Sequence, residues 1–241
     1  MPESLEDFLM KQAPTAERPL LGQTVLIVED SRYACEALRL ICQRSGARIR
    51  RADSLASAAR HLGMYRPSII LVDIGLPDGS GLDLVRNLAE TEPRIGVIMA
   101  MSGDDTFEAE EAVLAGADGF LEKPINSVSE FQSRMLRELP SDAQPSALRP
   151  VGDDIVTPDL LGLRDDLSLA ADLLAPEPDG ELIDYITAFL IGVSRSIEDN
   201  SLQSAVRNLA NARATNDVAI DERISVLRGL INERLNENAL V

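Results

Sequence analysis

The sequence predicts an α/β fold followed by an all-α one: a doubly wound parallel sheet in the first half and a four-helix bundle in the second. Short apolar runs alternate with helical patterns over residues 24–122, whereas only helical patterns follow residue 155. Between them lies PSDAQPSALRPVGDD, whose prolines and polar residues are typical of a linker. We therefore expect an N-terminal extension with room for a short helix at 1–21, a first domain at 22–139, a linker at 140–154 and a helical domain at 155–241.

Five strands are expected in the first domain. Four are runs of consecutive apolar residues, which are typical of strands covered on both faces of a sheet: VLIV, SIILV, IGVIMAM and GFL. The second strand, near ARIRRA, has a weaker signal. The first helix between strands begins at the N-cap Ser31 and ends at Gly46. The other helices cover about 54–64, 81–91, 105–116 and 126–139. This (βα)5 order requires right-handed crossovers.

The second half predicts four amphipathic helices joined by short turns. Thr157 and Pro158 are expected as the N-cap and first residue of a helix that runs to about Ala175. The next helix, within 180–199, is strongly apolar, and the third begins near residue 200. The fourth carries an apolar stripe of Ile220, Ile224, Leu227, Ile231 and Leu235. Four such helices are typical of a small bundle.

The composition narrows the expected partners and location. The formal net charge of −17 makes the chain repel the phosphates of nucleic acids and the surfaces of anionic membranes. No apolar run approaches the roughly 20 residues that span a bilayer, so we expect no membrane segment. The first residues, MPESLEDFLMKQ, are acidic and do not resemble a secretory signal. The expected location is therefore cytoplasmic.

Five polar residues follow or end the predicted strands. Glu29 and Asp30 close the first, Asp73 the third, Ser102 the fourth and Lys123 the fifth. In a doubly wound sheet, ligands bind beyond the carboxyl ends of the strands, near the point where the strand order reverses. The sequence therefore predicts that these side chains converge on one site.

The residue types at this site suit phosphoryl transfer to a carboxylate. Mg²⁺ prefers oxygen ligands, so the acidic side chains of Glu29, Asp30 and Asp73 are its expected ligands. The cation would screen an incoming phosphate from the acids, while Lys123 offers a positive charge to a phosphoryl oxygen. Ser102 offers a hydroxyl, and the small residue Gly103 leaves space beside it. Asp73 is thus the candidate acceptor.

Residues 22–139 resemble the receiver domain of two-component response regulators. The resemblance rests on VLIVEDS, LVDIGLPDGSGLDL, MAMSG and DGFLEKP, in this order along the chain. It implies a flavodoxin-like fold, Asp73 as the phosphoacceptor, Lys123 as the phosphate-binding lysine and a cis Lys123–Pro124 bond. It also implies Mg²⁺ as the cofactor, held by Glu29, Asp30 and Asp73, and a histidine kinase or a phosphotransfer protein as the phosphoryl donor.

The resemblance further implies a switch and not a turnover enzyme. After phosphorylation of Asp73, Ser102 would move toward the phosphoryl group and Phe120 would turn inward. Two positions depart from the commoner family pattern, because Ser102 stands in place of threonine and Phe120 in place of tyrosine. Neither departure threatens phosphorylation, but a phenylalanine cannot donate a phenolic hydrogen bond after it turns.

The helical second half leaves several functions open. Residues 151–241 contain no histidine, so they cannot form a histidine phosphotransfer domain, and we see no metal-ligand spacing or nucleophile–base pair. The main interpretation is a protein-interaction module with a downstream protein partner, including a second copy in a homodimer. The alternative is DNA binding through residues of helix 201–214: Gln203, Arg207, Asn208, Asn211 and Arg213. Against DNA stands the net charge of −10 over 151–241, from 17 acids and 7 arginines. A third interpretation is a phosphate sink or adaptor.

Overall fold

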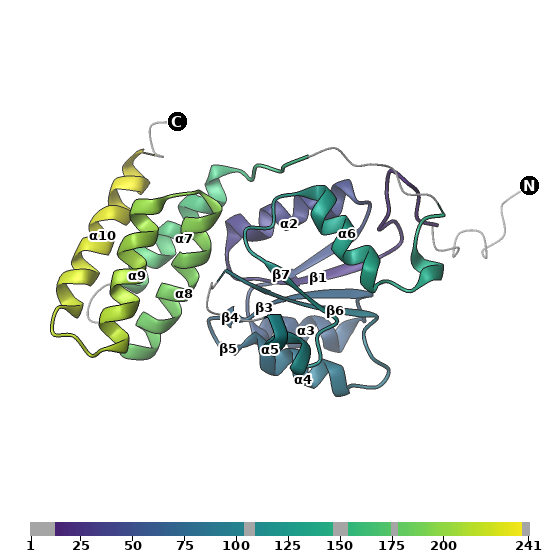
Figure 1. The fold of residues 1–241 in the computed structure, drawn as a ribbon, viewed down its shortest axis with the longest axis horizontal. Helices are drawn as coiled ribbons and strands as arrows, with labels where there is room; N and C mark the ends of the chain where they lie inside the picture. The colour runs from purple at the N-terminus through teal and green to yellow at the C-terminus, as the bar shows by residue number, and fades with distance from the viewer. Residues whose placement is uncertain (1–12, 104–108, 147–153, 175–177, 238–241) are drawn as a thin grey trace, which may run out of the picture.

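The structure is a computed structural model that describes residues 13–103, 109–146, 154–174 and 178–237. Within these ranges the chain forms a three-layered α/β/α unit with four further helices beside it (Figure 1). The short helix expected in the N-terminal extension falls largely on residues 1–12, outside the described ranges. Among the helices described, none combines the length and the apolar character needed to cross a membrane.

A five-stranded parallel sheet forms the middle layer, as the sequence predicts. Its strands stand in the order β2-β1-β3-β6-β7. Their bounds are β1 (Thr24–Val28), β2 (Arg48–Ala52), β3 (Ile69–Asp73), β6 (Val97–Ser102) and β7 (Gly119–Glu122). The chain moves from β1 outward to β2 and then returns past β1 to β3, so the strand order reverses between β1 and β3. A ligand crevice is expected above that reversal.

Helices cover both faces of the sheet. One face packs against α2 (Arg32–Arg44) and α6 (Val128–Glu138), and the other against α3 (Leu55–Met64), α4 (Gly81–Glu90) and α5 (Ala109–Leu114) (Figure 1). Strand β3 shows why its sequence is uniformly apolar: Ile69 and Leu71 belong to the first core, and Ile70 and Val72 to the second. All its residues are buried, as expected for a strand covered on both faces.

Strand β2 lies at one edge of the sheet, as β7 does at the other, and it is the more exposed of the two. Arg48, Arg50 and Arg51 are exposed, Ile49 is partly buried and only Ala52 is fully buried. The weak apolar signal of ARIRRA therefore reflects its position, since an edge strand has one neighbour and is covered less completely.

The structure adds local features that the sequence patterns did not predict. A two-residue hairpin, β4 (Gly75–Leu76) with β5 (Gly79–Ser80), occupies the loop after β3, and a 3₁₀ turn, η1 (Ser141–Ala143), follows α6. The Lys123–Pro124 bond is cis, as the resemblance implies, and the Glu92–Pro93 bond is also cis. Of the predicted helix 105–116, residues 105–108 lie outside the described ranges, and α5 occupies Ala109–Leu114 of the remainder.

The second half forms four helices, α7 (Leu160–Leu173), α8 (Gly180–Ser196), α9 (Asn200–Ala214) and α10 (Ile220–Glu237). Their apolar stripes share one core, as predicted, with buried residues that include Leu167, Ile186, Leu190, Leu209 and Leu227. Tyr33 of α2 joins this core from the first half of the chain. In Figure 1, α7 and α8 stand on the side of the bundle that faces the sheet, with α9 and α10 farther away.

The predicted start of the first of these helices is wrong by two residues. Thr157 and Pro158 precede the helix, and the N-cap is Asp159, whose carboxylate accepts the Leu161 N–H at 2.8 Å. The reason is a tertiary contact, because Val156 donates its N–H to Asn126 O at 2.8 Å and so holds this segment extended. This hydrogen bond overrides the preference of Thr157 for the N-cap position.

Candidate metal and phosphoryl-acceptor site

All five polar residues predicted at the strand ends come together at the carboxyl edge of the sheet. Glu29 and Asp30 follow β1, Asp73 ends β3, Ser102 ends β6, and Lys123 follows β7. They line one crevice, and Lys123 donates its N–H to Ser102 O at 2.8 Å. The crevice lies above the reversal of strand order between β1 and β3, where the predicted fold places a ligand site.

Three carboxylates in this crevice are close enough to share a metal ion. Glu29, Asp30 and Asp73 each offer an oxygen, and these oxygens lie within 4.8 Å of one another. Burial raises the pKa of Glu29 to about 8, against the opposing charge of Lys123. Burial and the charge of Asp73 likewise raise the pKa of Asp30 to about 6. Crowded, desolvated acids of this kind are stabilised by a cation.

One oxygen of this group is left without a hydrogen bond. Oδ1 of Asp30 is buried, and no donor among the residues that the structure describes reaches it. A buried acceptor without a partner carries an energetic cost, which a cation at that position would remove. Carboxylate oxygens are also the ligands that Mg²⁺ prefers, so the three acids fit a divalent cation.

Lys123 supplies the positive charge of the site. Its Nζ lies 2.6 Å from Glu29 Oε2 and 2.9 Å from Asp73 Oδ2, and the residue is almost fully buried. Burial alone would lower the pKa of Lys123, but the negative charges of Asp73 and Glu29 raise it above its usual value. The ammonium group therefore stays charged beside the carboxylate of Asp73, where it can meet a phosphoryl oxygen.

The sequence around the site explains how these side chains are held. Ser31 caps α2 by accepting the Ala34 N–H at 3.0 Å, and its own N–H is donated to Glu29 Oε1 at 3.1 Å. At Gly81 a Cβ would overlap the carbonyl oxygen of Asp73. A glycine is therefore required where α4 begins close to β3, which accounts for one glycine of the DGSG loop.

Phe120, predicted as the rotating aromatic, lies outside this crevice in the structure. It is partly buried and packs against the core on the α3, α4 and α5 side of the sheet. Its backbone pairs with Ala100 of β6, two residues before Ser102. The two residues are thus on neighbouring strands, and the residues that line the crevice do not include Phe120.

The far wall of the crevice comes from α8 and was not predicted from the sequence. This wall is formed by Ala188, Phe189, Gly192, Val193 and Ser196. One turn earlier, the hydroxyl of Tyr185 donates a hydrogen bond to Asp30 Oδ2 at 2.6 Å. A signal was present, because Tyr185, Ala188, Gly192 and Ser196 recur at helical spacing beside the apolar stripe. Only the apolar stripe of this helix entered the prediction, as part of the core of the bundle.

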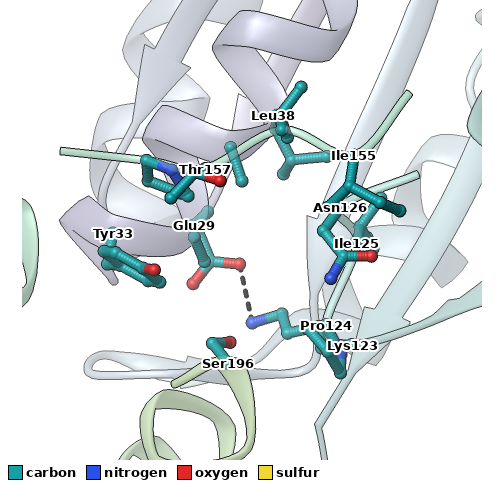
Figure 2. Close-up of a pocket in the computed structure, with 14 residues that line it drawn as sticks. Glu29, Tyr33, Leu38, Lys123, Pro124, Ile125, Asn126, Ile155, Thr157 and Ser196 are labelled. Atoms are coloured by element: carbon teal, nitrogen blue, oxygen red, sulfur yellow. Dashed lines mark ion pairs between the residues drawn. The ribbon is translucent and has the colours of Figure 1, made fainter. Parts of the chain in front are cut away.

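A second cavity lies on the other side of the ion pair between Glu29 and Lys123. Its volume is about 150 Å³. Figure 2 shows that ion pair at its floor, with Tyr33 on one side, Ile155 and Asn126 on the other, and Ser196 of α8 below. Residues 155–158 line this cavity and lead on along the chain into the helical bundle.

The family comparison agrees with this geometry. Residues 25–134 match the family model described as the response regulator receiver domain. These residues therefore match a receiver domain, the class of module to which the doubly wound sheet and its acid crevice also point. The particular proteins that it resembles are response regulators of bacterial two-component systems.

Two relatives illustrate the match and its extent. The chain is 32% identical over 139 residues to the KDP operon transcriptional regulatory protein KdpE of Escherichia coli K12, covering 56% of this chain and 60% of that one. It is 31% identical over 111 residues to the virulence transcriptional regulatory protein PhoP of Salmonella typhimurium, covering 46% and 49%. The matches thus span about half the length of these relatives.

Solved receiver structures align with the same share of the chain. The receiver domain of NtrX from Brucella abortus is 25% identical, with a TM-score of 0.44, over 48% of this chain and 97% of that one. A CheY-like receiver domain from Methylobacillus flagellatus is 27% identical, with a TM-score of 0.44, over 48% and 98%.

Proposed function

We propose that this chain is a phosphorylation-dependent signalling switch in which Asp73 accepts a phosphoryl group. The observation that carries the proposal is the placement of Asp73 Oδ2 2.9 Å from Lys123 Nζ, with two further carboxylates within 4.8 Å. A carboxylate nucleophile beside a fixed cation and a metal-binding acid pair suits an in-line attack on phosphorus. The histidine donor would leave as the acyl phosphate forms on Asp73.

Mg²⁺ is the cofactor that we assign to the acid group. Glu29, Asp30 and Asp73 would hold it, and when bound it would screen the negative charge of the incoming phosphoryl group. Two side chains of the protein would hold the phosphoryl group in place. Lys123 orients one phosphoryl oxygen, and the hydroxyl of Ser102 lies on the same crevice to donate to another. Movement of Ser102 and Phe120 would then report the event.

The donor and the output follow from this assignment. A histidine kinase or a phosphotransfer protein would supply the phosphoryl group, and residues 155–241 would form a separate domain that acts through a protein partner or a second copy. The acidic balance of 151–241, 17 acids against 7 arginines, supports a protein partner over nucleic acid.

DNA binding remains the second candidate because both named relatives are transcriptional regulatory proteins. One predicted contact residue is engaged elsewhere. Arg213 donates to Gly180 O at 3.2 Å and pairs with Asp184 at 3.1 Å, which ties α9 to α8. Retention of the protein on heparin at low salt would favour DNA, and elution in the flow-through would favour a protein partner.

Labelling by a small phosphodonor tests the proposed function directly. The protein is incubated with phosphoramidate and Mg²⁺, and intact mass spectrometry measures the gain of one phosphoryl group. Wild type should gain the group only with Mg²⁺, and Asp73→Asn should not gain it. Asp83→Asn, an exposed change in the following helix, serves as the matched control and should label as wild type does. Equal labelling of Asp73→Asn would exclude Asp73 as the acceptor.

A further inference from the structure

The cavity shown in Figure 2 is built from both halves of the chain. Helix α2 contributes Tyr33, the segment after β7 contributes residues 123–126, residues 155–158 line a further side, and Ser196 of α8 lies below. The volume is about 150 Å³, and an apolar cavity of that size can hold a benzene molecule. Ile155 in its wall is 54% exposed, so the cavity reaches the surface there and a small organic ring can enter it.

Part of the wall of this cavity is apolar and firmly held. Leu38 and Val156 are buried, and both belong to the core between the sheet and helices α2 and α6. Ala37 lines the cavity too, and because its side chain ends at Cβ it leaves room for a ligand. Apolar surface of this kind binds the body of a small molecule by removing it from water.

Two hydroxyl groups on the wall are available to a ligand. They belong to Tyr33 and Thr157, and neither forms a hydrogen bond with any residue in the described part of the chain. Tyr33 is only 8% exposed, so its hydroxyl is held in a largely enclosed position. A hydroxyl that is left without a protein partner in such a position gains stability from a ligand that donates to it or accepts from it.

The floor of the cavity favours a ligand without charge. Glu29 Oε2 and Lys123 Nζ lie 2.6 Å apart there, and both side chains are buried. Each charge therefore already has its partner. An anionic or a cationic ligand would be attracted by one member of the pair and repelled by the other, and it would lose its own hydration on entry. A neutral ligand avoids that cost.

We propose that this cavity binds a small neutral organic molecule, with an apolar ring of the size of benzene and a hydroxyl or carbonyl group that bonds to the hydroxyl of Tyr33 or of Thr157. Such a ligand would contact α2, the segment after β7 and residues 155–158 at once. It would therefore stabilise the folded chain when it binds. The inference goes beyond the proposed function, because it requires neither Mg²⁺ nor phosphorylation of Asp73.

Fluorine NMR with small probe molecules tests this site in the full chain. The probe is para-fluorophenol, which is neutral at pH 7, while fluorobenzene lacks the hydroxyl and para-fluorobenzoate and para-fluorobenzylamine carry opposite charges. We expect the signal of para-fluorophenol to shift and saturate with a dissociation constant of about 1 mM, which is reasonable for so few atoms. Fluorobenzene should bind about fivefold more weakly, because it forms no hydrogen bond. The two charged probes should bind more weakly than para-fluorophenol.

A variant that fills the cavity locates the binding. Ala37→Leu places a larger side chain in the cavity, and Ala59→Leu makes the same change at an exposed position of α3. Ala37→Leu should lose the saturable binding of para-fluorophenol, whereas Ala59→Leu should bind it as wild type does. The probe should also raise the midpoint of thermal unfolding of wild type and Ala59→Leu, but not that of Ala37→Leu.

Removal of the two hydroxyls tests the ligand class without filling the cavity. The double variant Tyr33→Phe/Thr157→Val should bind para-fluorophenol about fivefold more weakly than wild type and fluorobenzene equally well. Tyr65→Phe/Thr215→Val makes the same changes at the ends of α3 and α9, outside the cavity, and should bind both probes as wild type does. This pair decides the matter if Ala37→Leu does not fold.

The outcomes are distinct. Absence of para-fluorophenol binding in wild type, or equal binding in Ala37→Leu, overturns the inference, because the cavity would then hold water only. Equal binding of para-fluorophenol and fluorobenzene to wild type, or tighter binding of a charged probe, overturns the ligand class. None of these measurements involves Mg²⁺ or a phosphodonor, so a failure of Asp73 to accept a phosphoryl group is detected separately.

Discussion

Asp166 and Ser31, 135 residues apart in the chain, form a buried hydrogen bond in which the Ser31 hydroxyl donates to Oδ2 at 2.7 Å. The Arg32 and Tyr33 N–H groups donate to the same carboxylate. An acid at the start of α2 also meets the positive end of the helix dipole. Burial raises the pKa of Asp166, and the three hydrogen bonds oppose that rise. One acid of the helical bundle thus completes the capping of the receiver's first helix.

Asp166→Asn should therefore destabilise the chain. An amide group would turn one N–H₂ donor toward a backbone N–H donor, and we expect a loss of about 2 kcal/mol in the free energy of unfolding, measured by urea titration. Asp165→Asn is the matched control at the neighbouring residue. It breaks only the exposed pair with Arg32, 51% and 62% exposed, and should cost less than about 1 kcal/mol. Equal losses in the two variants would contradict the capping role.

The close approach of α7 to α2 makes a second prediction. A Cβ at Gly162 would lie 3.1 Å from Tyr33 N and 3.2 Å from Arg32 C, both backbone atoms that cannot move easily. We expect Gly162→Ala to lower the midpoint of thermal unfolding, although alanine favours helix.

Gly229→Ala is the control for helix propensity alone. It places a methyl group within α10 where nothing lies within 4 Å. It should stabilise the protein by up to about 1 kcal/mol. A stabilising Gly162→Ala would show that α7 and α2 can separate slightly without cost.

Asp199 gives a prediction with a defined pH dependence. It caps α9 by accepting the Leu202 N–H at 3.0 Å, and it accepts a charge-assisted bond from Arg234 of α10 at 2.7 Å. The bond from Arg234 lowers the pKa of Asp199. A lowered carboxyl pKa gives stability that is present above the unfolded value and is lost as the pH falls through the folded value.

Asp199→Asn keeps the cap but removes the charge, because asparagine is also a good N-cap residue. At pH 7 the variant should be less stable by about 1 kcal/mol. The difference should persist to about pH 5 and shrink below about pH 4, where the unfolded carboxyl is protonated. Urea titrations of both proteins from pH 3 to pH 8 measure it. A difference that grows on acidification would contradict this sign.

Loss of the buried ammonium predicts a response to metal. In Lys123→Gln, Glu29 and Asp73 lose their shared cation, and breaking a buried pair costs about 3–5 kcal/mol. We expect a lower thermal midpoint without divalent cations. Mg²⁺ should then raise the midpoint more in the variant than in wild type, because it replaces the missing charge and stabilises the folded state by binding. Equal increases in both proteins would show that Lys123 and the cation act independently.

The parts of the fold and site that could be predicted depend on local information. Asp73 could be placed because four buried apolar residues lead up to it. Ser31 could be placed because serine is a favoured N-cap residue, and its hydroxyl accepts the Ala34 N–H at the start of α2. The convergence of Glu29, Asp30, Ser102 and Lys123 follows from parallel topology, since every strand ends at the same edge of the sheet.

The features that could not be predicted depend on contacts between distant residues. The N-cap of α7 is Asp159 and not the predicted Thr157, because the backbone of Val156 pairs with that of Asn126. The hydrogen bond from α8 to the crevice joins Tyr185 to Asp30, 155 residues away. Sequence periodicity identifies which face of α8 is apolar, but it does not indicate that a second face of the same helix packs on another part of the chain.

The exposed arginines of β2 limit how this molecule can associate with itself. An edge strand offers unpaired N–H and C=O groups to any other strand of suitable length. Here a second copy placed alongside would bring Arg48, Arg50 and Arg51 against an identical cationic row, and like charges on facing strands repel. The β2 edge is therefore protected from continuous sheet growth and aggregation, even though its backbone is open.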